Sequence, residues 1–373
     1  MEQFETEIYL RYKQIIESRR VLSNLACRSS SRHDLFASDI ETCKHVSASL
    51  SSSVIPAYEP ESRWRIKSAM TLFSDLSNQQ KIKSSALPPS VTLSEIIDRY
   101  DAFCFDGYGT LYNRGSFVYP GAMEWFKMLR AAGKHIRLVT NAASDVDAVL
   151  ARDADKRGFD FTEAETISSG SLLFDLVQQL RSDTAKPLEL REVYYIGRET
   201  GKNVLAKCGI TAVAMDAEPT EPIVAISSAK DTPETYAQAV KILQKPGAIL
   251  FVLNSDAWAP KIPDENGVTV REPVSGALSE RLRRDSACDA NGGEGCTTYY
   301  LGKPFPAIWE KVKRSLPVGA NVLMIGDTLG TDVYGAKVAG FDSALVVGRN
   351  VPATELETDE TVLGIRPDYY LKA

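Results

Sequence analysis

From Val91 onward, short apolar runs alternate with segments of mixed polarity. The runs Phe103–Phe105, Ile136–Val139 and Val322–Ile325 are apolar throughout or nearly so, which is typical of strands buried on both faces. Strands that alternate with helices predict a parallel sheet covered by helices on both faces. The pattern therefore predicts an α/β fold with a Rossmann-like parallel sheet.

The segments between these runs have helical periodicity. Pro120 precedes the first, and Gly133 is suited to end it. One face of this helix would carry four apolar side chains: Ala122, Trp125, Phe126 and Leu129. A second helix is expected to end at Ala339, before Gly340, with a strand following at 343–347.

The stretch from about residue 171 to 298 has strand and helix units of its own. The expected strands are 193–196, 223–226 and 248–253, and the expected helix is 233–243. Because this stretch lies between two parts of the sheet domain, it is interpreted as an inserted α/β cap. A domain inserted beside an active-site edge can act as a lid.

The first ninety residues follow a different pattern. Apolar residues at helical spacing predict an amphipathic helix in the first twenty, and a second helix is expected at 64–76. Pro88 and Pro89 mark a boundary. No catalytic constellation occurs here, so a packing or oligomerisation role is expected. The expected parts are a helical extension at 1–90, a core at 91–170 and 299–373, and a cap at 171–298.

Composition excludes several classes of function. The 373 residues include 43 basic and 49 acidic side chains, for a net charge of −6, and an acidic chain is a poor partner for nucleic acid. No apolar run approaches the roughly 18 residues of a membrane span, and the N-terminus lacks the pattern of a signal peptide. We therefore expect a cytoplasmic protein with no nucleic-acid or membrane partner.

Histidine and cysteine are too sparse for several kinds of site. The three histidines lie in no zinc or serine-hydrolase motif, and the six cysteines form no C-x-x-C pair. Zinc knuckles and thioredoxin-type redox chemistry are therefore not expected.

Polar residues follow three of the predicted strands, namely Asp106, Thr140 and Asp327. Ligands of parallel α/β sheets bind at the carboxyl ends of the strands. Asp106 is suited to be a nucleophile for phosphoryl transfer, and together with Asp327 it could hold Mg²⁺. Lys303 offers a positive charge and Thr140 a hydroxyl to the transferring group. Each of these residues alone has an ordinary structural interpretation, but their joint occurrence favours an active site.

In their order and setting, these residues resemble the four motifs of the haloacid dehalogenase (HAD) superfamily. The motif residues are Asp106-Gly-Tyr-Gly-Thr-Leu111, Val139-Thr-Asn141, Gly302-Lys-Pro304 and Gly326-Asp327 with Asp332. Further runs resemble its class IIA capped branch: Tyr119-Pro-Gly-Ala122, Ile167-Ser-Ser-Gly170 and Asn254-Ser-Asp256. The resemblance covers about residues 95–350. With an aromatic residue two positions after the first Asp, the chain resembles one subgroup of this branch.

The resemblance implies a HAD core with an inserted C2-type cap, a Mg²⁺ cofactor and a small phosphorylated substrate. It also makes a homodimer formed through the cap plausible. The expected catalytic residues are Asp106, Tyr108 and Lys303. Gly107, Thr110, Thr140, Asn141 and Asp256 are expected to bind the substrate or its phosphate. The expected metal-binding residues are Asp106, Asp327, Asp332 and Tyr108, the last through its backbone carbonyl.

One departure from the family pattern leaves the chemistry open. HAD phosphatases usually have a second Asp two residues after the nucleophile, which acts as general acid and base, whereas this chain has Tyr108. A phenol with a pKa near 10 is a poor acid at neutral pH. The loss of general acid–base help typically costs about 10²–10⁴-fold in rate.

Three functions remain compatible with this departure. The first is a Mg²⁺-dependent phosphatase. Its substrate would have a leaving group that needs little protonation, or the general acid would come from the cap, for example from Asp256 or Asp231. Alternatively, the chain is similar to 2-haloacid dehalogenases, which share the Asp-x-Tyr-Gly-Thr run but have a small cap and need no metal. The third alternative is a catalytically weak scaffold that binds a phosphorylated ligand or a protein.

Overall fold

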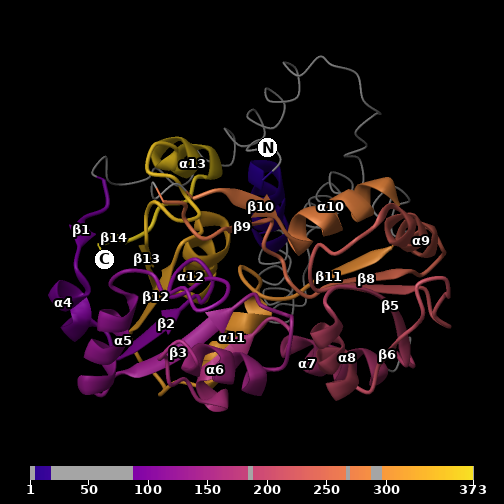
Figure 1. Ribbon diagram of the computed structural model, residues 1–373, viewed down its shortest axis with the longest axis horizontal. Coiled ribbons are helices and arrows are strands. Elements are labelled where there is room, and N and C mark those ends of the chain that lie inside the picture. The colour runs from indigo at the N-terminus through magenta and orange to yellow at the C-terminus, as the bar shows by residue number, and fades with distance from the viewer. Residues whose placement is uncertain (1–4, 18–86, 184–187, 266–268, 287–295, 373) are drawn as a thin grey trace, which may run out of the picture.

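The computed structural model describes residues 5–17, 87–183, 188–265, 269–286 and 296–372. Its larger sheet has seven parallel strands (Figure 1). In spatial order they are β1 (Ser90–Val91), β14 (Tyr369–Leu371), β13 (Asp342–Leu345), β12 (Val322–Gly326), β2 (Ala102–Phe105), β3 (His135–Thr140) and β4 (Thr166–Ser168). This arrangement confirms the predicted α/β class.

Helices cover both faces of this sheet. Successive side chains of its buried strands point to opposite faces, so both faces carry apolar side chains that pack against helices. Phe103 and Phe105 of β2 pack with α5, whereas Cys104 packs with α11 and α12. The helices associated with this sheet are α4 (Leu93–Ile96), α5 (Ala122–Ala131), α6 (Asp147–Asp155), α11 (Pro306–Arg314), α12 (Tyr334–Ala339) and α13 (Leu356–Leu363). Helix α5 buries the four apolar residues predicted for its face.

Shorter helical turns join these elements. They are the 3₁₀ turns η1 (Ile97–Arg99), η2 (Glu163–Glu165) and η3 (Glu199–Gly201) and the π-helix η4 (Leu329–Val333). The sequence predicts a helix that ends before Gly340, and α12 does end there, with Gly340 in the left-handed conformation. The π-helical turn before α12 was not predicted. Such turns are frequent at functional sites.

A second, five-stranded parallel sheet lies beside the first (Figure 1). Its strands, in order, are β11 (Thr297–Tyr300), β8 (Ile249–Val252), β7 (Ile223–Ile226), β5 (Glu192–Ile196) and β6 (Thr211–Ala212). Its helices are α7 (Leu172–Arg181), α8 (Lys202–Lys207), α9 (Pro233–Leu243) and α10 (Ser275–Asp285). We propose that this unit is the cap and the seven-stranded unit is the core, with the last cap strand ending at Tyr300.

A pair of antiparallel strands connects the cap to the loop that follows β2 of the core. Strands β9 (Trp258–Pro260) and β10 (Arg271–Pro273) run antiparallel to each other. The side-chain amide of Asn113, in the loop after β2, donates to the carbonyl of Pro260 at 3.0 Å. This pair therefore extends over the loop that follows the first motif.

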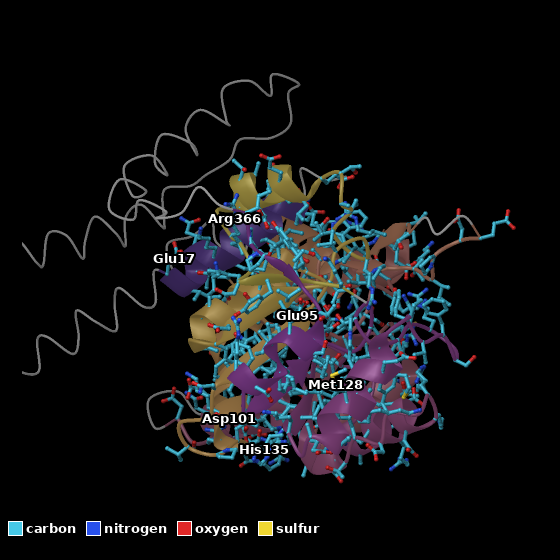
Figure 2. The ribbon with its side chains drawn as sticks, turned by 90° about the vertical axis from the view of Figure 1, so that its left-hand side faces the viewer. Glu17, Glu95, Asp101, Met128, His135 and Arg366 are labelled. Atoms are coloured by element: carbon cyan, nitrogen blue, oxygen red, sulfur yellow. The ribbon has the colours of Figure 1, made fainter. Side chains whose placement is uncertain are left out.

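The predicted N-terminal helix is present at residues 5–17 and lies between core and cap elements (Figure 1). Figure 2 shows Glu17 and Arg366 toward one end of the molecule, and Asp101 and His135, at the amino ends of β2 and β3, toward the other. The second helix predicted for the extension, at 64–76, lies outside the described residues. Within the described ranges, no helix is both long and apolar enough to cross a bilayer.

Candidate active site

The carboxyl ends of β2, β3 and β12 bring three polar residues to one edge of the core sheet. Phe105 pairs with Ile325 of β12 and with Leu138 of β3. The next residue, Asp106, donates its backbone amide to the carbonyl of Ile325 at 3.0 Å. Because parallel strands end at a common edge, Asp106 and Asp327 emerge side by side, as the sequence predicts.

Three carboxylates form a compact cluster at this edge. One oxygen each of Asp106, Asp327 and Asp332 lies within 4.8 Å of the other two, and all three residues are buried. The π-helix η4 carries Asp332, whose Oδ2 accepts hydrogen bonds from the backbone amides of Asp327 and Thr328, each at 3.1 Å. The turn therefore fixes Asp332 beneath the strand end.

Lys303 is the cation of this cluster. Its Nζ lies 2.5 Å from Oδ1 of Asp106 and 2.7 Å from Oδ1 of Asp332, and the residue is only 1% exposed. Burial alone would lower the pKa of Lys303, but the charges of Asp106, Asp332 and Asp256 raise it above its ordinary value. Lys303 is therefore charged at neutral pH and joins the first and last motifs.

Negative charge exceeds positive charge in this cluster. Burial raises the pKa of Asp106 to about 7 despite the opposing effect of Lys303, and the neighbouring carboxylates Asp332 and Asp256 contribute to the rise. Burial, followed by the charges of Asp106 and Asp332, raises the pKa of Asp327 well above its usual range. An additional cation would relieve this repulsion.

The cluster fits a divalent metal ion. Oδ2 of Asp327 is buried and accepts no hydrogen bond from the described residues. Gly109, at φ +99°, is required beside it, since a Cβ at this position would lie 2.0 Å from that oxygen. Hard carboxylate oxygens in a charge-rich site are the ligands that Mg²⁺ prefers. Asp332 differs, because one of its oxygens already binds two amides and the other pairs with Lys303.

Asn141 connects the core site to the cap. Its Oδ1 accepts from the Lys303 backbone amide at 2.7 Å, and its Nδ2 contacts the Lys303 carbonyl at 3.0 Å. The same Nδ2 lies 2.8 Å from Oδ1 of Asp256 and 3.2 Å from Oγ of Ser255. Gly302, at φ +93°, permits this approach, since a Cβ there would lie 2.3 Å from Oδ1 of Asn141. Asn141 therefore orients Lys303 and Asp256.

Asp256 is the cap carboxyl that reaches the site. Burial raises its pKa to about 6, whereas Lys303 and the hydrogen bond from Asn141 lower it. The turn in this segment is formed by Asn254, whose Oδ1 accepts the Asp256 backbone amide at 2.8 Å. The carboxyl of Asp256 is therefore not used in its own turn. Asp231, the other cap carboxyl considered from the sequence, directly precedes the Thr232 cap of α9.

Tyr108 is half-buried and packs edge-on against Tyr112, with ring centroids 5.1 Å apart. Burial raises its phenol pKa above the ordinary value. Among the charged neighbours, Arg157 and Arg198 lower this pKa, whereas Asp153 raises it. The Tyr108 hydroxyl is therefore a weaker acid than an ordinary phenol, and charged residues of both the core and the cap affect its pKa.

The remaining predicted residues lie in the loops after β2 and β3. Thr110 is fully buried, and its Oγ1 has no hydrogen-bond partner among the described residues. Thr140 is also buried, and its Oγ1 accepts the Ala142 amide at 3.2 Å. Gly107 packs closely under Tyr112, since a Cβ there would lie 2.7 Å from the Tyr112 hydroxyl oxygen.

Sequence reasoning missed one buried arginine of this region. The Arg349 guanidinium lies 4.1 Å from the Tyr119 ring centroid and donates from Nη1 to the carbonyls of Gly109 and Thr110. Burial lowers its pKa to about 10. Arg349 thus supports the loop after Asp106. Nothing in the sequence pattern distinguishes an arginine in this loop from a surface residue.

Comparison with known proteins adds independent support for the family. Residues 103–211 match the model of a haloacid dehalogenase-like hydrolase family, and residues 300–373 match a HAD-hydrolase-like family. The chain belongs to the haloacid dehalogenase superfamily of hydrolases. The sequence resemblance to its class IIA branch is confirmed.

Individual relatives cover most of the chain. A 4-nitrophenylphosphatase from Schizosaccharomyces pombe is 26% identical over 75% of this chain and 93% of its own length. A HAD superfamily structure from Cytophaga hutchinsonii shares the fold, with a TM-score of 0.62, 22% identity and coverage of 77% and 98%. A glycerol phosphate phosphatase from Mycobacterium tuberculosis in complex with magnesium has a TM-score of 0.54 and 25% identity, with coverage of 74% and 76%.

Replacing Asp327 by Asn should stabilise the metal-free protein and remove its response to Mg²⁺. An unfolded Asp loses its proton near pH 4, whereas folded Asp327 retains it to a higher pH. This residue therefore lowers the free energy of unfolding as pH rises from about 4 toward its folded pKa. At pH 8 the isosteric amide, which carries no charge, should therefore raise the free energy of unfolding of the metal-free protein.

Thermal unfolding from pH 5 to 8, with chelator or with excess Mg²⁺, measures both effects. Asp231→Asn is the matched control, because it removes a cap carboxyl outside the cluster. If Asp327→Asn kept the wild-type stabilisation by Mg²⁺, the assignment of Asp327 as a metal ligand would be wrong.

Proposed function

We propose that the protein is a Mg²⁺-dependent phosphatase that hydrolyses a small phosphorylated metabolite through an aspartyl-phosphate at Asp106. The observation that carries this proposal is the contact of Asp106 with Lys303 beside a buried oxygen of Asp327 that no described residue hydrogen-bonds. This arrangement offers a nucleophile, a fixed cation and a metal position at one strand edge. The phosphatase relatives and the magnesium-bound structure of one such enzyme support it.

In this proposal Asp106, Asp327 and the backbone carbonyl of Tyr108 hold the metal, while Asp332 positions Lys303. When bound, Mg²⁺ supplies positive charge that offsets the phosphoryl oxygens and keeps Asp106 ionised. An oxygen of Asp106 attacks phosphorus, and the bond from phosphorus to the leaving oxygen breaks. Lys303 and Thr140 neutralise and hydrogen-bond the transferring group. Water then hydrolyses the aspartyl-phosphate and regenerates Asp106.

The leaving oxygen needs a proton, and Asp256 is the side chain best suited to provide it. Tyr108 is a weaker acid than an ordinary phenol, and the carboxyls of Asp327 and Asp332 serve the metal and Lys303. Asp256 comes from the cap and has a pKa of about 6, so its protonated form is populated near neutral pH. After proton transfer, the same carboxylate is suited to activate the hydrolytic water.

Asp106→Asn should abolish the phosphatase activity. The amide is a poor nucleophile and a poor ligand, so Mg²⁺-dependent phosphate release from 4-nitrophenyl phosphate should fall by roughly 10³-fold or more. Asp231→Asn should leave turnover unchanged. Halide release from a 2-haloacid without metal would instead support the dehalogenase alternative. Metal binding with neither activity would favour a binding scaffold.

Asp256→Asn should slow substrates in proportion to the basicity of their leaving groups. We expect a loss of about 10²-fold for phenyl phosphate and a much smaller loss for 4-nitrophenyl phosphate, whose leaving group needs little protonation. A carboxyl added in Tyr108→Asp should restore phenyl phosphate turnover to the Asp256→Asn variant. Equal losses for both substrates would exclude Asp256 as the acid.

A further inference from the structure

The helix at residues 5–17 contacts the core and the cap at once. On the core side, Lys13 donates to the carbonyl of Leu363 at 3.1 Å, at the end of α13. On the cap side, Glu5 forms an ion pair with Arg271 of β10 at 2.8 Å. Figure 1 shows this helix, in indigo, between α12 and α13 on one side and α10 on the other, with β9 and β10 next to it. The helix therefore joins two units whose relative position determines the site.

Tyr12 is the most deeply placed residue of this helix. It is completely buried, and its ring lies 5.0 Å from that of Phe305 and 5.1 Å from that of Tyr300. Its hydroxyl donates to the backbone carbonyl of Ser255 at 3.0 Å. Ser255 directly precedes Asp256, so this bond fixes the cap segment that carries the proposed acid.

Ser255 passes this restraint to the core motifs. Its hydroxyl donates to the carbonyl of Lys303 at 2.5 Å and accepts from the amide of Asn141 at 3.2 Å. Two polar contacts therefore separate Tyr12 from the residues that orient the catalytic lysine. The side chains of Tyr12, Ser255 and Asn141 are all buried, so water does not compete for these hydrogen bonds.

Tyr9 provides a second contact with the same region. Its ring lies on Gly330 of the π-helix η4, where a Cβ would come within 2.3 Å of the ring. Burial raises its pKa, and nearby carboxylates, Asp256 and Asp332 among them, raise it further. The helix thus lies directly behind the catalytic carboxylates, although neither family model extends to it.

We infer that the helix at 5–17 is part of the catalytic unit and that Tyr12 is a positioning residue, which holds Ser255 and Asp256 in register with Asn141 and Lys303. The inference rests on the proposed phosphatase function. It assigns to a segment outside the family models the task of fixing the cap acid over a core that has lost the usual one.

Tyr12→Phe tests this role, because it keeps the ring and removes only the bond to Ser255. Turnover of phenyl phosphate should fall about three- to tenfold, as expected for one hydrogen bond. KM should be unchanged, and turnover of 4-nitrophenyl phosphate should be nearly unchanged. Tyr194→Phe is the matched control, since that buried tyrosine also donates to a backbone carbonyl, Met215, at 3.1 Å within the cap.

A purely structural role for Tyr12 would give a different result. Tyr12→Phe would then lower thermal stability as Tyr194→Phe does and leave the ratio of the two turnover rates at the wild-type value, which would overturn the inference alone. A wild-type protein with no phosphatase activity would overturn the proposed function and the inference with it.

Ser255→Ala tests the same network from the cap, and it keeps the inference testable if Tyr12→Phe does not fold. It should produce the same selective loss for phenyl phosphate, and the double variant should lose less than the product of the two single losses. Independent, multiplicative losses would contradict a shared network.

Discussion

The site depends on one buried lysine among carboxylates that outnumber it. Lys303 pairs with Asp106 and Asp332, and Asp256 and Asp327 lie close enough to affect the same charges. Burying several like charges is costly unless cations and hydrogen bonds compensate for them. Lys303 and the backbone amides of Asp327 and Thr328 compensate only in part, which leaves the pKa of Asp106 at about 7 and Oδ2 of Asp327 without a hydrogen-bond donor among the described residues. The divalent cation of the proposed mechanism would offset this imbalance.

The same charge imbalance explains why the cap must be held firmly. Asp256 adds a further carboxyl to the cluster from a separate unit, so repulsion would favour its withdrawal. Asn141 opposes this withdrawal with hydrogen bonds to Asp256, Ser255 and the Lys303 backbone. The N-terminal helix adds a restraint from outside. Residues of the cap, the core and the extension thus together hold the Asp256 segment in place. This arrangement is consistent with the proposal that the general acid comes from the cap and not from position 108.

The sequence was sufficient to predict several of the strands and helices and the meeting of Asp106 and Asp327 at one edge of the sheet. Strands β2 and β12 are continuous apolar runs, and the face of α5 follows from its spacing. The clustering of Asp106 with Asp327 follows because parallel strands end at one edge. The bond from Tyr12 to Ser255 was not predictable, since it joins residues 243 positions apart and neither has a local signal. The π-helical turn and the contacts of Arg349 likewise depend on tertiary packing. The assigned roles of the site residues are proposals.

The central claim is that Asp106 accepts the phosphoryl group beside a metal held by Asp327. A crystal structure of the protein with Mg²⁺ and beryllium fluoride tests it most directly, because this fluoride imitates an aspartyl-phosphate. The account predicts continuous density from the Asp106 carboxylate to beryllium, with Mg²⁺ in contact with Asp106 and Asp327. Beryllium fluoride bound elsewhere, or Mg²⁺ bound with no density joined to Asp106, would contradict it.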